Sequence, residues 1–326
     1  MQSADTPARP LTETRSGTPA GGTFGQARTR LRFSVVYLLL LAVVFSPLLW
    51  SLAIHGSKNN LHSHVLLIPF VSAYVLWIRW KDLPTAYRSS WLPASIAGAL
   101  AAAALSAAWI FAPALFLLSH NDFLALVTFS LVCCLAAGGF AFLGNRWMAA
   151  AAFPILFLLF MVPLPDAAVD ALETASKLGS AETTDLFFSL SGTPFLRSGT
   201  VFQLPGIALE VAQECSGIRS SWVLLITSLL ASNLFLRTQW RRAVLVLFVI
   251  PLGLIRNGFR IMVIGLLCVH IGPEMIHSVI HRRGGPLFFA ASLIPLFALA
   301  WWLRAGEQKK SHSAVRGSDV ATPRTD

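Results

Sequence analysis

One of the four cysteines, Cys215, stands in surroundings that favour a reactive thiol. Glu214, Ser216 and Arg219 flank it, at the point where a polar stretch passes into a long apolar segment. Polar, electropositive surroundings stabilise the thiolate, which is the nucleophilic form of a cysteine. The other three cysteines lie inside apolar runs: Cys133, Cys134 and Cys268. Cys215 is therefore the candidate nucleophile of this chain.

An arginine and a histidine would complete a set of groups able to perform acyl transfer. Arg260 lies within an apolar stretch, where an ionisable side chain is costly and calls for an explanation. His281 lies shortly before the last apolar segment. In such a set the thiolate attacks a peptide carbonyl, while the imidazole takes the thiol proton and later protonates the leaving amine. The guanidinium stays charged, so it cannot be the base, but it can stabilise the thiolate and the oxyanion.

Each of these residues also has an alternative interpretation. A cysteine near the start of a helix can be structural, an arginine in the outer half of a span can extend to the head groups, and histidines can be interfacial polar residues. His277 lies one helical turn before His281, so it is a second candidate for the base. The same two histidines would share a helix face and could bind a metal, with Cys215 or Glu274 completing the site.

The composition is that of a polytopic membrane protein. Of the 326 residues, 55% are hydrophobic and 12% are charged, whereas a soluble domain carries about 25% charged residues. The formal net charge of +10 does not indicate a nucleic-acid partner, because the basic residues lie between apolar blocks and in the tails. Four cysteines, three of them in apolar segments, provide no disulfide framework.

The apolar blocks predict an all-α fold with about eight transmembrane helices, since roughly 20 apolar residues cross a bilayer. The predicted spans are 33–54, 64–80, 93–116, 122–143, 147–164, 217–236, 243–268 and 285–304. Residues 1–30 and 305–326 are poor in large apolar side chains and are predicted to be disordered cytoplasmic tails. Between them, residues 31–304 form the transmembrane domain. The polar N-terminal stretch lacks the pattern of a cleavable signal.

The basic residues predict the orientation of the spans. With eight spans, most groups of Lys and Arg between and beside the spans fall on one side of the membrane, and the short loops on the other side, around 55–63 and 117–121, carry only Lys58. These groups are Arg28, Arg30 and Arg32; Arg79, Lys81 and Arg88; Arg146; Arg237, Arg241 and Arg242; and Arg304, Lys309 and Lys310. Both termini are therefore expected in the cytoplasm, and the alternate connections are expected to face outward.

The longest connection, residues 165–216, is expected to face outward. Apolar residues recur at helical spacing over about 168–190, which predicts one or two amphipathic helices at the membrane interface. Residues 195–212 have the pattern of a short β-hairpin. Glu210 or Glu214 could orient the histidine base or pair with the arginine.

This topology places the candidate residues at one depth. Cys215 lies at the outer end of the sixth span, and His281 lies just before the eighth span starts on the same side. Arg260 follows Arg242 by 18 residues, or about 27 Å of helix, which brings it toward the outer interface. A thiol, a guanidinium and an imidazole that are far apart in sequence are thus predicted to meet at the outer face.

Five motifs make most of residues 60–300 similar to the exosortase/archaeosortase family of membrane transpeptidases. The motifs are Ser63–Pro69 with Tyr74–Arg79, Met161–Pro165, Leu204–Gly206 with Glu210–Ser220, Arg256–Ile261, and His281–Gly285. The sequence differs from the usual family pattern at three places. Val65 replaces a usual glycine, Arg256 stands where a small residue is normal, and the pair Arg282-Arg283 is atypical.

The resemblance implies a cysteine transpeptidase of the bacterial inner membrane with its active site on the outer face. Such enzymes recognise exported proteins that end in a Pro-containing motif, a transmembrane helix and a basic cluster (the PEP-CTERM type of sorting signal), and they are often found with exopolysaccharide export. They cleave near the motif and are thought to pass the acyl group to an acceptor. No cofactor and no metal are implied.

The family's proposed catalytic cysteine, arginine and histidine correspond to Cys215, Arg260 and His281. We expect four further residues of these blocks to bind substrate or support the site, and they are Glu214, Arg219, Asn257 and His277. The lipid bilayer and the substrate are then the expected partners.

Two other functions fit eight spans. One is a transporter or a polysaccharide-assembly subunit without enzymatic activity. A transporter places ionisable residues near the midplane, whereas here the third to fifth spans hold almost no charge and the polar residues gather at one face. The other is a metal-dependent hydrolase built on His277 and His281, which chelators would inhibit and loss of Cys215 would not.

Overall fold

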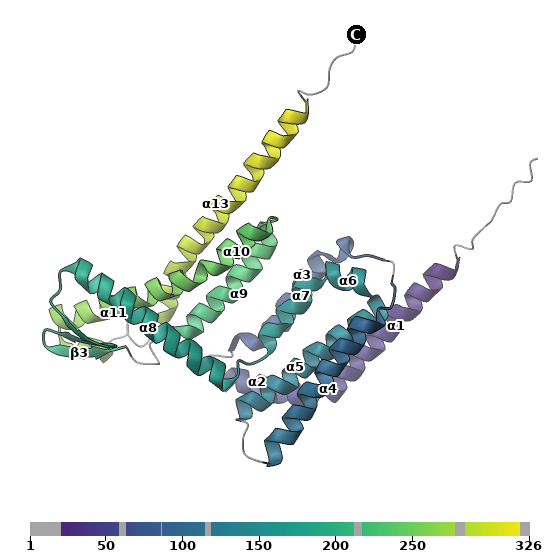
Figure 1. Cartoon of the computed structure of the whole chain (residues 1–326), viewed down its shortest axis with the longest axis horizontal. Helices are drawn as coiled ribbons and strands as arrows, with labels where there is room; N and C mark the ends of the chain where they lie inside the picture. Colours follow the sequence, from purple (N-terminus) through teal and green to yellow (C-terminus); the bar gives the residue numbers. More distant parts are fainter. Residues whose placement is uncertain are drawn as a thin grey trace, which may run out of the picture.

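The computed structural model describes residues 21–58, 63–85, 87–114, 119–211, 217–277 and 284–319. The described chain is mostly helical with one small sheet, which confirms the predicted all-α polytopic class. Figure 1 shows two groups of helices: α1 to α7 form one group, and α8 to α13 with the sheet form the other. Where the two groups are nearest, α9 of one group lies opposite α3 and α7 of the other (Figure 1).

The first group begins with a bent helix pair. Helices α1 (Gly21–Val44) and α2 (Ser46–Lys58) meet at 61°. Pro47 has no backbone N–H to donate to the Val43 carbonyl one turn earlier, and the Ser46 hydroxyl donates to that carbonyl instead at 2.8 Å. The sequence predicts a span over 33–54, and in the structure this range is divided between the two helices. The proline accounts for the break.

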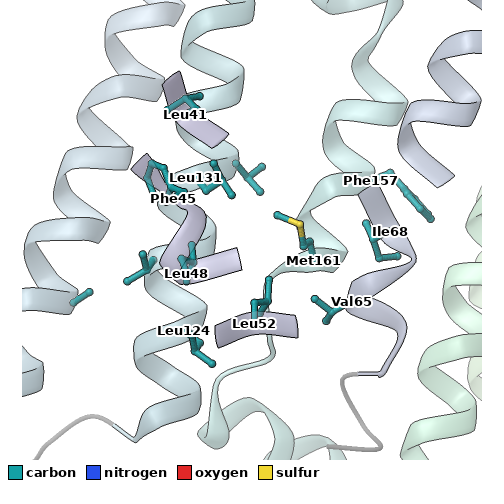
Figure 2. Packing of buried hydrophobic residues seen from close by; sticks show 13 residues of the cluster. Leu41, Phe45, Leu48, Leu52, Val65, Ile68, Leu124, Leu131, Phe157 and Met161 are labelled. Carbon is teal, nitrogen blue, oxygen red and sulfur yellow. The ribbon is translucent and has the colours of Figure 1, made fainter. Parts of the chain in front are cut away.

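The rest of this group packs around one apolar core. Helices α4 (Trp91–Ala114) and α5 (His120–Gly138) form an antiparallel pair, and the π-helical turn η3 (Gly139–Leu143) prolongs α5. Figure 2 shows the core side chains converging from α1, α2, α5 and the segments around α3 and η4. Its buried members include Phe45, Leu52, Ile68, Leu124 and Phe157.

Short elements replace two predicted spans. The second span consists of η1 (Ser63–Leu66) and α3 (Ile68–Ile78), and the fifth is divided into α6 (Asn145–Ala150), α7 (Ala152–Phe157) and η4 (Leu158–Met161). Of the spans predicted over 64–80 and 147–164, the first is a shorter apolar helical stretch, His64–Ile78, and the second is interrupted between short helices. After η4 the chain turns by 90° into α8.

The long connection 165–216 folds, over its described residues, as one helix followed by a sheet. Helix α8 (Asp166–Ser191) confirms the helical pattern predicted over 168–190. The predicted hairpin is a three-stranded antiparallel sheet of β1 (Leu196–Ser198), β2 (Val201–Leu204) and β3 (Ile207–Glu210). In the register, Phe202 is opposite both Arg197 and Leu209. Buried Phe188 and Phe202 pack this unit against the C-terminal part of α11.

The second group holds α9 (Ile218–Phe235), α10 (Gln239–Leu247), α11 (Val249–His270), η6 (Pro273–His277) and α13 (Gly285–Asp319). Helices α10 and α11 are nearly continuous. Pro251 cannot donate to the Leu247 carbonyl, so the helix is interrupted there. Buried leucines from α9, α10, α11 and α13 form its core, among them Leu224, Leu245, Leu252 and Leu296.

Within the described residues, five helical stretches are long and apolar enough to cross a membrane, or up to seven if each bent pair forms one span. The five are Trp91–Phe111, His120–Leu143, Ile218–Phe235, Gln239–His270 and Gly285–Gln308. Helix α1 begins at Gly21 and α13 runs to Asp319, so both extend into stretches assigned to the tails. The division into tails and transmembrane domain stays a prediction.

Candidate active site

The described structure brings together the two sequence blocks that carry the candidate cysteine and arginine. Cys215, Glu214 and His281 themselves lie outside the described residues, and of His277 only the backbone is described, as the last residue of η6. The part of the site that the structure describes is formed by residues of α8, α9 and α11.

The start of α9 is held directly on α11. Arg256 Nη2 of α11 donates to the Gly217 carbonyl oxygen at 3.1 Å and to Ser221 Oγ, also at 3.1 Å. Gly217 is the N-cap residue of α9 and follows Cys215 by two positions. Arg256 therefore fixes the chain immediately beyond the candidate nucleophile.

Gly217 makes this close approach possible. Its φ of +70° lies in the left-handed region that side chains disfavour. A Cβ at this position would lie 3.0 Å from Asn257 Oδ1 and 3.2 Å from Arg256 Nη2. Any side chain here would therefore push the start of α9 away from the two polar residues of α11.

Arg256, which departs from the family pattern in the sequence, forms the main contact between α11 and the start of α9. Its side chain is buried, with 8% of the residue exposed, and its Nη1 has no hydrogen-bond partner among the described residues. A buried guanidinium is costly unless it is well hydrogen-bonded, so its retention calls for a role. The signal in the sequence was its spacing, one helical turn before Arg260 in an apolar helix.

Asn257 anchors helix α8 to the same part of α11. Its Nδ2 donates to Ser180 Oγ of α8 at 2.9 Å, and both residues are almost fully buried. Thr183 Oγ1 donates to the Leu254 carbonyl at 3.0 Å. Small residues allow this contact, because a Cβ on Gly258 would lie 2.2 Å from Thr183 Oγ1. The arginine block thus connects α8 to the start of α9.

Arg260 lies one turn after Arg256, and residues at this spacing share a helix face. It is half-buried, with a buried Nε. Ten more residues of α11 follow it, or about 15 Å of helix. The prediction placed Arg260 at the outer interface. In the structure α8 and the sheet cover the remainder of α11, so Arg260 lies beneath this layer.

Near the start of α9, a hydrogen bond joins the two groups of helices. Trp222 Nε1 donates to His64 Nε2 at 3.1 Å, so the ring proton of a neutral His64 is on Nδ1. At the other end of α9, Arg79 Nη2 donates to the Asn233 carbonyl at 3.2 Å and to Asn233 Oδ1. Helices α3 and α9 therefore run in the same direction. The predicted topology requires this of the second and sixth spans.

An apolar cavity of about 300 Å³ adjoins Trp222. Phe160, Pro163 and Pro165 line it, and the two prolines belong to the Met161–Pro165 motif. Trp222 is five residues beyond Gly217, so the cavity lies within about two helical turns of the start of α9.

Several charged residues of α8, β1 and β3 form ion pairs with one another. Lys177 Nζ lies 3.5 Å from Glu210 Oε1, so Glu210 has a lysine partner in the structure. Arg197 of β1 contacts Glu182 at 2.5 Å and Asp185 at 3.7 Å, and the hydrogen bonds that it donates to Glu182 raise the pKa of Arg197. Arg219 is exposed in the first turn of α9.

The described residues contain no group of three or more His, Cys, Asp or Glu residues that could hold a metal ion. His281 and Cys215, which the metal hypothesis used, lie outside them.

A family model described as transmembrane exosortase matches residues 50–298, which is more than half of the 326 residues. The chain belongs to the transmembrane exosortase family. No curated protein and no solved structure matches it significantly. The matched range runs from α2 to α13 and contains both blocks that meet at Gly217. Together with its apolar helices, membership makes this exosortase a multi-pass membrane protein.

Proposed function

We propose that this exosortase is a membrane-embedded cysteine transpeptidase that cleaves the C-terminal sorting signal of exported proteins through a thioester on Cys215. The observation that carries the proposal is the bond from Arg256 to Gly217, because it ties the cysteine segment to the arginine block of α11. The matched family supports a sorting role in the membrane.

In the first half-reaction His281 takes the proton of the Cys215 thiol, and the thiolate attacks the carbonyl carbon of the scissile peptide bond. The oxyanion of the tetrahedral intermediate is stabilised by the Arg260 guanidinium. The C–N bond then breaks, and the histidine returns its proton to the leaving amine. The substrate is left as an acyl thioester, and the C-terminal peptide departs with its transmembrane helix.

In the second half-reaction an amine acceptor or water attacks the thioester carbonyl. The histidine takes the proton of the attacking group, the C–S bond breaks, and the thiolate is restored. His277 is the second candidate for this base. Arg256 and Asn257 are positioning residues, because they hold the start of α9 and helix α8 on α11.

The substrate would enter from the bilayer as a helix. Its basic cluster would stop at the cytoplasmic face, and the length of its transmembrane helix would then bring the Pro-containing motif to the depth of Cys215 at the outer face of the bacterial inner membrane. Positioning of this kind supplies a large part of an enzymatic rate. The apolar cavity beside Trp222 and Pro163 is suited to the apolar part of the motif.

The test is coexpression with a protein from the same genome that carries the tripartite C-terminal signal, followed by intact-mass analysis of its C-terminus. We expect processing by the wild type and by Cys134→Ala, and none by Cys215→Ala. A new C-terminal mass would separate hydrolysis from transfer. Processing that survives in Cys215→Ala, and that a chelator abolishes, would replace the thiol mechanism by the metal hypothesis.

A further inference from the structure

A second polar site lies at the opposite end of α9 from Gly217. A cavity of about 840 Å³ is formed where α3, α9, α10 and α13 come together. Five arginines and one carboxylate line it, and these are Arg79, Arg237, Arg241, Arg242, Arg304 and Glu307. The cavity therefore carries a strong excess of positive charge.

The single carboxylate does not neutralise this charge. Glu307 of α13 accepts the backbone N–H of Arg237 at 3.0 Å and that of Thr238 at 2.8 Å, so it caps the start of α10. Across the ranges that the structure describes, none of the five arginines forms an ion pair. Uncompensated like charges around one cavity repel one another, and a bound anion would relieve that repulsion.

Arg241 indicates where an anion would bind. Only 6% of this residue is exposed, its Nη1 donates to the Leu303 carbonyl, and its guanidinium lies 5.2 Å from the ring centre of Trp240. Its Nε is buried and has no acceptor among the described residues. A buried donor without an acceptor is costly, and a phosphate oxygen would satisfy it.

Exposed tryptophans surround this end of the helices. Trp77 and Trp80 lie at the end of α3, Trp240 at the start of α10, and Trp301 beside Arg304 on α13. Tryptophan gathers at the head-group level of membranes, because its ring is apolar and its N–H is polar. The cavity therefore lies at the depth of lipid phosphates rather than in the hydrocarbon.

We propose that this cavity is a phosphate-binding site, occupied by the head group of an anionic phospholipid. Arginine suits this ligand because its planar fork can donate two hydrogen bonds to one phosphate. Basic cavities between transmembrane helices are typical binding places for such head groups. A soluble phosphate ester shares this chemistry and is the second possible source. The inference does not depend on the proposed transpeptidase activity.

The test is lipid retention by the full-length protein, purified in detergent and measured by native mass spectrometry after titration with phosphatidylglycerol or phosphatidylcholine. We expect the wild type to retain phosphatidylglycerol about tenfold better than phosphatidylcholine, and Arg241→Gln to lose that preference. Because Arg241 is buried, the double variant Arg237→Gln with Arg304→Gln changes the exposed rim instead and should weaken retention comparably.

The matched control is Arg146→Gln, which removes an exposed arginine predicted on the same side of the membrane but outside the cavity. It should retain phosphatidylglycerol like the wild type. Inorganic phosphate that displaces the lipid and raises the melting temperature by itself would identify a soluble phosphate ester as the source. Equal retention of both lipids, or equal retention by all variants, would overturn the proposal.

Discussion

The two ends of α9 each hold a buried arginine from the neighbouring α10–α11 unit, but they use it differently. At the start of α9, Arg256 has protein acceptors on Gly217 and Ser221, in a tightly packed contact without room for a side chain at Gly217. At the end of α9, Arg241 borders a large cavity with four further arginines. Arg256 thus holds the start of α9 in place, whereas Arg241 lies beside a space that a ligand could occupy. Burial alone therefore does not reveal the role of an arginine in a membrane helix.

The largest effect on substrate processing should come from Arg260→Lys, one helical turn beyond Arg256 in α11. Lysine keeps the charge but lacks the planar fork that contacts an oxyanion with two donors, so we expect substrate processing to fall about a hundredfold or more. The measurement is the rate of substrate cleavage after coexpression. Arg146→Lys, which changes an exposed arginine, should process normally. Near-normal cleavage by Arg260→Lys would argue against its catalytic role.

Arg256→Gln should affect the contact at the start of α9 without affecting the cavity at its other end. Glutamine is too short to hold both Gly217 and Ser221, so the cysteine segment loses its anchor and processing should fall about tenfold or more. Retention of phosphatidylglycerol should remain that of the wild type, because Arg256 is remote from the cavity. If processing and lipid retention fell together, the variant would have disturbed the whole fold.

Two glycines with the same backbone conformation allow the contact at Gly217 to be tested by itself. Gly217 and Gly192 both have φ of 70° and ψ of 11°, but a Cβ on Gly192 would meet nothing within 4 Å. Alanine at either position should cost about 1–2 kcal/mol of stability. Only Gly217→Ala should also reduce processing, by about tenfold, because it displaces Asn257 and Arg256. Equal processing by both variants would mean that the contact is not needed.

The smallest effect is expected at Arg197, a partly buried arginine that serves as the reference for the two buried ones. Glu182→Gln removes the ion pair between α8 and Arg197 of β1. Exposed ion pairs contribute little, so the melting temperature should fall by about one degree or less. Thermal unfolding in detergent measures the change. A fall of several degrees would show that the sheet depends on this pair.

Much of the architecture could be predicted from the order of apolar and polar residues. The apolar blocks indicated a multi-span helical protein, and the spacing over 168–190 indicated α8. The breaks were missed, because a proline such as Pro47 interrupts a helix without interrupting the apolar block that contains it. A third strand was missed because the hairpin pattern includes only two strands and a turn.

The sequence by itself determined the class of multi-span helical protein, and it predicted which residues could do chemistry and on which side of the membrane their segments should meet. Only the tertiary structure decided what Arg256 and Arg241 contact, since both are arginines in apolar helices and look alike in sequence. Their partners lie 35 or more residues away in the chain, on Gly217, Ser221 and Leu303. The physical reason is that a buried guanidinium must find acceptors in three dimensions, and residue spacing along one helix does not specify which neighbouring helix will supply them.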